Sequence, residues 1–291
     1  MTLSSDQIAE YRERGYLAVS GVFTPVEVRE LQAVTDEFVE RSRLVSEHTE
    51  VFDLEPGHTA EHPRLRRLKA PHRQHPAYDR ALRNERLLGL LRGLLGDSIR
   101  HLNTKLNLKS PEFGSPVEWH QDWAFYPHTN DDMLAVGVML DDMRLENGPL
   151  MVMPGTHKGP VFDHHVDGYF AGAIDPDATD LDYTKAVSLT APAGSMSFHH
   201  VRLVHGSAQN TSERSRQLLL YEYAAADAWP LMGVSDFANF NERVVSGEPT
   251  IVPRVVAAPI RMPLPPSPHP GSIYENQTGA RNKYFKVREL V

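Results

Sequence analysis

The first 97 residues carry hydrophobic positions at helical spacing, three or four residues apart. One such stripe follows Thr24-Pro25-Val26-Glu27, which fits a capping box with proline at the first helical position. A second stripe begins near Asn84 and ends at Gly96, a residue suited to a helix C-terminus. A shorter helix can begin at Ser4. The pattern therefore predicts a mostly helical N-terminal part, residues 1–97.

From about residue 98 the pattern changes to short apolar runs that are separated by Gly, Pro, Asn and Asp. These strand-like runs cover residues 101–109, 134–140, 150–153, 186–190 and 217–224. Many short strands without helix–strand alternation favour a jelly roll over a Rossmann sheet or a TIM barrel. We expect a mainly β fold with flanking α-helices, whose jelly-roll core covers residues 98–226.

The last part of the chain, residues 227–291, has a different composition. Residues 253–270 hold seven of the 22 prolines, which excludes a regular helix or a central strand and predicts an extended arm. The sequence does not decide whether this arm covers a site or contacts another subunit. Since no repeat or low-complexity linker interrupts the chain, we expect a single domain over residues 1–291 and leave the oligomeric state open.

Composition narrows the chemistry. The chain has 291 residues, 15 histidines and no cysteine, so disulfides, thiolate zinc sites, iron–sulfur clusters and cysteine nucleophiles are excluded. The net charge of −8 argues against nucleic-acid binding. No run of about 20 apolar residues predicts a membrane span, and the polar N-terminus lacks the apolar core of a secretory signal. We expect a cytoplasmic protein that has no membrane or nucleic-acid partner.

The segment Glu118-Trp119-His120-Gln121-Asp122-Trp123 holds the first candidate site. In a strand, residues two apart point to the same face, so His120 and Asp122 would project together. His205 follows 83 residues after Asp122 and can return beside them on a later strand of a jelly roll. Two histidines and one carboxylate form the facial triad of non-haem Fe(II) oxygenases. Such a triad leaves positions on the metal for a chelating keto acid and dioxygen.

A second candidate group follows His205 directly. Arg216 lies 11 residues after His205, and a hairpin over residues 207–215 would return it to the interior of the barrel. A buried guanidinium there suits a bidentate bond to a carboxylate, and Ser207 could add a hydroxyl donor. The alternative is that Arg216 is an ordinary charge on the surface of a strand.

Taken together, these motifs resemble those of the phytanoyl-CoA dioxygenase family, which includes ectoine hydroxylase-like enzymes. The resemblance covers most of the chain. It rests on His120-x-Asp122, on His205-Gly206-Ser207 with Arg216 at +11, on the opening segment 15–23, and on Glu146–Leu150 with Pro154–His157. It implies a cupin-like double-stranded β-helix that uses Fe(II), 2-oxoglutarate and O2. The implied reaction hydroxylates an unactivated carbon of a small molecule and releases succinate and CO2.

The resemblance also implies roles for single residues. His120, Asp122 and His205 would be the iron ligands and catalytic residues, while Arg216 and Ser207 would bind the distal carboxylate of 2-oxoglutarate. Asn107 is the preferred further contact to 2-oxoglutarate, although Lys105 and Lys109 share its face of the strand. The intact Asp122 favours hydroxylation over halogenation, since related halogenases carry a small residue there.

Two alternatives stay open, namely another metal-dependent enzyme of cupin type and a non-catalytic binding protein that retains the barrel. The substrate is also undetermined. Residues 64–92 hold nine Lys or Arg and only two acids, Asp79 and Glu85. Such a run is most often a solvated face, but it can also form a rim that attracts an anionic substrate.

Overall fold

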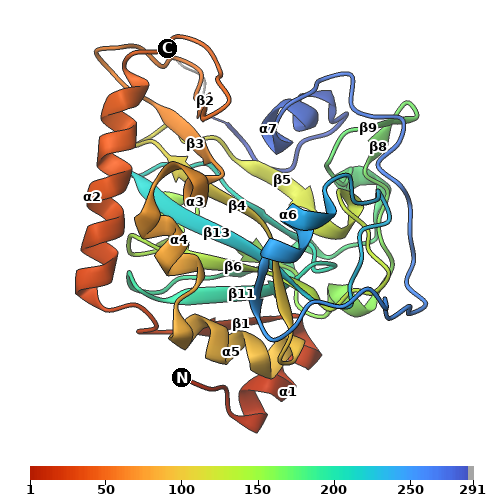
Figure 1. Ribbon diagram of the computed structural model, residues 1–291. Helices are drawn as coiled ribbons and strands as arrows, with labels where there is room; N and C mark the ends of the chain where they lie inside the picture. The colour runs from red at the N-terminus through yellow and green to blue at the C-terminus, as the bar shows by residue number, and fades with distance from the viewer. Residues whose placement is uncertain (288–291) are drawn as a thin grey trace.

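A computed structural model describes residues 1–287 of the chain. Two antiparallel sheets enclose an interior, and helices cover the outer face of the larger sheet (Figure 1). The mainly β, cupin-like architecture expected from the sequence is therefore confirmed. No helix of the described part is both long and apolar enough to cross a membrane.

The larger sheet consists, in spatial order, of β1 (Tyr16–Val19), β11 (Met196–His200), β6 (Met133–Met139), β13 (Arg216–Ala225), β4 (Ile99–Lys109), β3 (Leu65–Lys69) and β2 (Phe52–Leu54), with β14 (Val244–Ser246) paired to β4. The smaller sheet has the order β10 (Val187–Ser188), β7 (Met151–Val152), β12 (His205–Ser207) and β5 (Val117–His120). A separate hairpin joins β8 (His165–Val166) to β9 (Tyr169–Phe170). The long central strands β4 and β13 pair over their whole length, so they set the length of the interior.

The helices begin and end largely where the local sequence predicts. They are α1 (Ser5–Arg14), α2 (Pro25–Ser42), α3 (Pro71–Gln74), α4 (Pro76–Leu82), α5 (Glu85–Leu95), α6 (Phe237–Glu242) and α7 (Ile273–Asn276). Thr24 and Glu27 form the expected capping box before α2, and α5 runs from the Asn84 cap to Gly96. Leu31 and Phe38 of α2 pack with Leu87 of α5 in the core cluster that covers the outer sheet face.

The N-terminal part also contributes strands that the hydrophobic pattern did not reveal. The segment Leu65–Lys69 carries three basic residues, yet it forms β3 and pairs with β4. Asp53 on the adjacent strand β2 neutralises part of this charge, since its carboxylate lies 2.8 Å from the ammonium of Lys69. The strand is therefore stabilised by a contact from another segment, which a local pattern does not show.

The C-terminal extension follows the surface without regular structure between Ser246 and Ile273, as its prolines predict. It is then bonded to β5. The Gln277 amide oxygen accepts from the backbone N–H of Glu118 at 3.0 Å, and the Glu118 carboxylate accepts from the N–H of Tyr284 at 2.8 Å. The extension thus closes one side of the barrel interior (Figure 1).

Candidate metal centre and cosubstrate cavity

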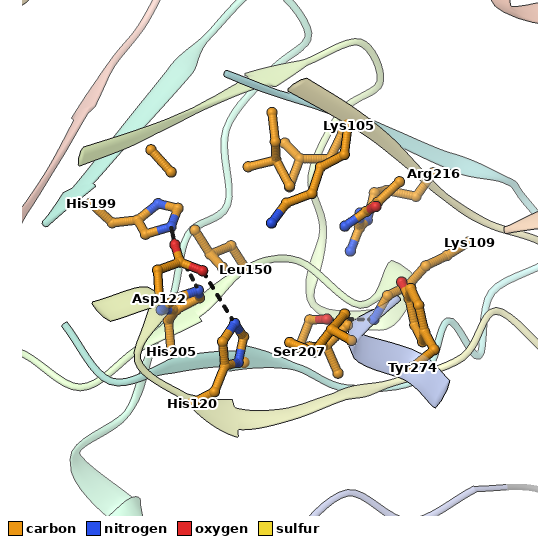
Figure 2. A pocket seen from close by; sticks show the side chains of 17 residues that line it. Lys105, Lys109, His120, Asp122, Leu150, His199, His205, Ser207, Arg216 and Tyr274 are labelled. Atoms are coloured by element: carbon orange, nitrogen blue, oxygen red, sulfur yellow. Dashed lines mark hydrogen bonds and ion pairs between the residues drawn. The ribbon is translucent and has the colours of Figure 1, made fainter. Parts of the chain in front are cut away.

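The end of β5 and the start of β12 bring the three expected metal ligands together. His120 is the last residue of β5, and His205, the first residue of β12, is its direct partner across the sheet. The expectation of one continuous strand through Asp122 is wrong, because β5 stops at His120 and Asp122 opens a 3-10 turn over Asp122–Ala124. The turn still directs the carboxylate toward the two histidines (Figure 2).

These three residues form a compact and buried group. One ligand atom from each of His120, Asp122 and His205 lies within 4.8 Å of the others. The Nε2 atoms of both histidines are 3.8 Å from the oxygens of Asp122. Within the described part of the chain, no other group of three His, Cys, Asp or Glu residues meets this metal-site geometry. The arrangement matches a site for one metal ion with two nitrogen ligands and one oxygen ligand.

Hydrogen bonds fix which ring nitrogen of each histidine is free. The Nδ1 of His120 lies 2.8 Å from the carbonyl oxygen of Glu118, and the Nδ1 of His205 lies 2.9 Å from that of Leu203. Since a carbonyl oxygen can only accept, each Nδ1 must carry the proton. Both Nε2 atoms therefore present lone pairs toward Asp122 and the space beside it, as metal binding requires.

The protonation states also suit a cation. Burial lowers the pKa of His120 to about 4 and lowers that of His205 well below its ordinary value. Burial alone would raise the pKa of Asp122, but its neighbours His205, His199 and Lys105 hold it well below its ordinary range. The site therefore combines neutral imidazoles with an ionised carboxylate, which are the forms that coordinate Fe(II).

His199 of β11 is a further histidine beside the three expected ligands. Its Nε2 lies 3.6 Å from Asp122 Oδ2, and its ring centroid lies 4.5 Å from that of His205, with the two rings tilted by 53°. Its neighbour His200 points away and packs against Tyr11 and His157. The alternation of a strand could have predicted that only one of the pair reaches the site, and His199 is that one.

A second cluster lies at the other end of the same cavity. Arg216, the first residue of β13, and Lys109 of β4 are almost fully buried. The Lys109 ammonium donates to the Ser207 hydroxyl at 2.8 Å, and the Arg216 guanidinium donates to the Gly148 carbonyl. Neither cation forms an ion pair with an acid among the described residues, and the Nε of Arg216 has no partner. The alternative of a surface charge at Arg216 is wrong.

Both cations have lowered affinity for their protons. Burial lowers the pKa of Arg216 to about 10. Burial, followed by the charge of Arg216, lowers the pKa of Lys109 well below its ordinary value. Two buried cations without a carboxylate are costly unless an anion from outside pairs with them. This end of the cavity is therefore suited to a carboxylate ligand.

The space between the two clusters measures about 50 Å³ and is lined by Lys105 and Asn107 as well as by the two groups already described. The Lys105 ammonium points into it between the triad and Arg216 (Figure 2). The Asn107 amide oxygen is buried without a partner. Tyr274 of α7 also lines it, and no sequence signal could have identified this residue, since its contact joins distant segments.

The basic stretch 64–92 mostly does not surround this cavity. Its cations pair with acids instead: Arg66 with Glu275, Lys69 with Asp53, Arg80 with Glu30, Arg83 with Asp79, Arg86 with Glu27 and Arg92 with Glu85. The local excess of charge is balanced largely from other parts of the chain. The expectation of an ordinary solvated face describes five of these six residues better than that of a substrate-attracting rim, and Arg66 is buried.

Comparisons with known proteins agree with this site. Residues 11–218 match the family model described as phytanoyl-CoA dioxygenase. A probable alpha-ketoglutarate-dependent hypophosphite dioxygenase of Stutzerimonas stutzeri is 40% identical over 97% of this chain and 99% of its own. An L-proline trans-4-hydroxylase of Streptomyces griseoviridis is 32% identical over 75% of this chain and 85% of its own.

Solved structures show the same architecture. EctD from S. alaskensis, solved with 2-oxoglutarate and 5-hydroxyectoine, has a TM-score of 0.67 and 25% identity over 88% of each chain. The non-heme alpha-ketoglutarate-dependent carbocyclase SnoK has a TM-score of 0.64 and 25% identity, covering 85% of this chain and 93% of its own. These relatives use alpha-ketoglutarate, which is 2-oxoglutarate, as the cavity of this chain would allow.

Proposed function

The chain belongs to the phytanoyl-CoA dioxygenase family and is an Fe(II)- and 2-oxoglutarate-dependent dioxygenase that hydroxylates a small molecule; from this premise we propose its site residues and its substrate. When bound, iron and 2-oxoglutarate supply the chemistry, in which O2 gives one oxygen atom to succinate and the other to the substrate, with loss of CO2. A cytoplasmic location stays a prediction from the sequence.

For the metal, the ligands are the Nε2 atoms of His120 and His205 and a carboxylate oxygen of Asp122. The observation that supports this assignment is the orientation of both imidazoles, whose Nδ1 protons are held by backbone carbonyls. His199 is a positioning residue, because it contacts the carboxylate of Asp122 and so fixes the direction of its oxygens.

For 2-oxoglutarate, the distal carboxylate binds Arg216, with Ser207 and Lys109 beside it. Support comes from the two buried cations that lack a carboxylate partner at this end of the cavity. Asn107 lies one inward position closer to the triad along β4 than Lys109, so it contacts the middle of the cosubstrate. This ordering places Lys109 at the distal carboxylate and leaves Lys105 nearest the metal.

As the substrate, we propose a small anion, with hypophosphite as the first to test. The similarity to a hypophosphite dioxygenase over nearly the full length of both chains supports this choice. The buried ammonium of Lys105, directed toward the metal side of the cavity, provides a cation for such a ligand. In the reaction one P–H bond of hypophosphite becomes P–OH, which gives phosphite, and 2-oxoglutarate becomes succinate and CO2.

A substrate that is hydroxylated at carbon is the second candidate. A hollow of about 430 Å³, which has enough room for an amino acid, is lined by both Arg243 and Asp236. These opposite charges would suit a zwitterion of the kind that the L-proline hydroxylase acts on. The two candidates differ in the atom that is oxidised and in the charges that would bind the substrate, but both would use the same metal ligands and cosubstrate.

The test supplies purified protein with Fe(II), 2-oxoglutarate and O2, together with hypophosphite, L-proline or ectoine in separate reactions. Succinate is quantified, phosphite is followed by phosphorus NMR, and hydroxylated amino acids are followed by mass spectrometry. We expect succinate and phosphite in equal amounts with hypophosphite. Succinate without phosphite, together with a hydroxylated amino acid, would replace hypophosphite by the second candidate.

Two variants test the metal assignment. His120→Ala and Asp122→Ala each remove one of three ligands and should abolish succinate formation with every substrate. Lys69→Met serves as the matched control, since Lys69 belongs to the larger sheet but lines none of the cavity, and it should keep full activity. Retained turnover in both ligand variants would contradict the metal assignment.

A further inference from the structure

The inward-facing residues of β4 and β13 form two parallel rows that run the length of the interior. In order from the Arg216 end, the rows are Lys109, Asn107, Lys105 and Asn103 on β4, and Arg216, Leu218, Leu220 and Glu222 on β13. The first three residues of each row line the metal and cosubstrate cavity. The last of each row, Asn103 and Glu222, lines the hollow of about 430 Å³. The two spaces therefore follow one another along the same strands.

The hollow opens to solvent. Asn103 lies within the central strand β4, yet it is exposed, whereas its neighbour Thr104 is buried on the helix side. Tyr126, His128 and Arg243 are among the other residues that line it. Since Arg216 and the distal-carboxylate cluster occupy the opposite end of the rows, cosubstrate and hollow lie on different sides of the triad.

An ion pair separates the two spaces. The Lys105 ammonium, which faces the inner cavity, donates to the Glu222 carboxylate, which faces the hollow, at 3.0 Å. Their side chains are 18% and 5% exposed, so both charges are largely withdrawn from water. Tyr126 adds its hydroxyl at the same level, close to the carboxylates of both Asp122 and Glu222. Any molecule that passes from the hollow to the triad meets this pair.

We propose that the hollow is the entry path of the substrate and that an anionic group of the substrate binds Lys105 beside Glu222. This inference rests on the proposed function, and it identifies the residues that would select the substrate by charge. An ammonium has three N–H donors, and Glu222 accepts from one of them, so further donors are available to an incoming oxyanion.

Glu222 also limits the charge that the site accepts. A monoanion such as hypophosphite gains hydrogen bonds from Lys105 and carries only one negative charge for the Glu222 carboxylate to repel. A dianion meets twice that repulsion from Glu222 and from Asp122, at a place where burial weakens screening. Phosphite, which loses its second proton near neutral pH, is such a dianion. The carboxylate of Glu222 would therefore weaken binding of the dianionic product more than that of the monoanionic substrate.

The test measures binding without turnover. Under nitrogen, the protein with Fe(II) and 2-oxoglutarate is titrated with hypophosphite and with phosphite, and the charge-transfer absorption of the iron complex reports occupancy beside the metal. Lys105→Met should weaken hypophosphite about tenfold or more, since a charged hydrogen bond is lost, and should change 2-oxoglutarate affinity less than about twofold. Asn103→Trp, which narrows the hollow, should slow hypophosphite binding, followed by rapid mixing, at unchanged 2-oxoglutarate affinity.

Glu222→Gln tests the charge limit. It should strengthen phosphite relative to hypophosphite about tenfold, because one repelling charge is removed. Lys69→Met is the control, since it alters an ion pair of the same sheet, with Asp53, that lines neither space, and it should leave both affinities unchanged. If Glu222→Gln destabilises the protein, the double variant Lys105→Met/Glu222→Gln removes both charges and should bind neither anion well.

The outcomes separate the inference from the function on which it rests. Equal weakening of 2-oxoglutarate and hypophosphite in Lys105→Met would make Lys105 a cosubstrate ligand and would overturn the inference. Unchanged hypophosphite binding in Lys105→Met and Asn103→Trp would overturn it as well, while turnover in the wild type would keep the proposed function. If the wild type oxidises another small molecule instead, hypophosphite is wrong as the substrate, and unchanged binding of that molecule in Lys105→Met would overturn the inference.

Discussion

Two lysines four residues apart on β4 occupy opposite electrostatic surroundings. Lys109 lies beside another cation, Arg216, and burial lowers its pKa well below the ordinary value. Lys105 is also buried, but the carboxylate of Glu222 more than offsets the effect of burial and raises its pKa. The fold thus completes one charged pair by itself and leaves the other cations without a counter-ion. The end with Lys109 and Arg216 is therefore suited to a carboxylate of the cosubstrate, whereas a ligand at Lys105 must share that cation with Glu222.

The largest effect is expected from Arg216→Met. It removes the cation that lacks a carboxylate, so 2-oxoglutarate should bind about 100-fold or more weakly, which corresponds to roughly 3 kcal/mol for a lost buried charge pair. The free energy of unfolding without cosubstrate should hardly fall, because an uncompensated buried charge is also removed. Calorimetric titration and thermal unfolding measure the two quantities. A large loss of stability without a loss of 2-oxoglutarate affinity would show that Arg216 stabilises the fold and does not bind the cosubstrate.

Glu222→Gln should give the opposite result. Lys105 then keeps a buried charge without its counter-ion, and the free energy of unfolding should drop by about 2 kcal/mol. The double variant Lys105→Met/Glu222→Gln should recover most of this loss, since no unpaired charge remains. Chemical denaturation of the four proteins in the cycle provides the measurement. Additive losses in the double variant would show that the two residues do not interact.

The pH dependence of 2-oxoglutarate binding should be next in size. The carboxylate of bound 2-oxoglutarate raises the lowered pKa of Lys109. At a pH between the pKa of the free protein and that of the complex, binding therefore takes up a proton. The affinity for 2-oxoglutarate then falls as the pH rises, by up to about tenfold per pH unit. The stability of the protein without cosubstrate should change with pH in the opposite direction. The unfolded chain binds the proton more tightly, so stability rises with pH through the same window. Calorimetry in buffers of different ionisation enthalpy detects the proton, and Lys109→Met should abolish its uptake.

Asn107→Ala should have the smallest effect. The side chain is an uncharged contact, and its loss should weaken 2-oxoglutarate only about threefold to tenfold, equivalent to roughly 1 kcal/mol. Asn107→Asp places a negative charge in the same volume and should weaken it more. If both variants bind 2-oxoglutarate as tightly as the wild type does, Asn107 does not contact the cosubstrate.

Local signals predicted much of the fold and of the site. The helix boundaries at Thr24 and Asn84 follow from caps, which depend on a few adjacent residues. The metal ligands were reached through spacing and family resemblance, and the structure brings them together. Glu222 was also accessible, because it lies at even spacing from Arg216 along β13, on the face that the arginine shares.

Other features depend on contacts between distant segments. Residues 65–69 form strand β3 because Asp53 forms an ion pair with Lys69 and because β4 pairs with the backbone of the segment. Neither contact can be read from residues 65–69 alone. Asp122 left the strand that its spacing predicted, since the chain turns immediately after His120. Tyr274 reaches the cavity only because Gln277 and Tyr284 bond the extension to Glu118. For β3 and for Tyr274 the deciding contacts come from other elements of the chain, whereas for Asp122 the cause is the turn itself.

The late position of Tyr274 has a consequence for biosynthesis. All strands that carry the metal ligands and the cations are complete by Ala225, but the wall that Tyr274 supplies belongs to a segment that the ribosome makes afterwards. A growing chain therefore exposes the triad before its cavity is closed. The wall that Tyr274 supplies is added only when this segment has emerged and docked, so until then the cavity stays open on that side.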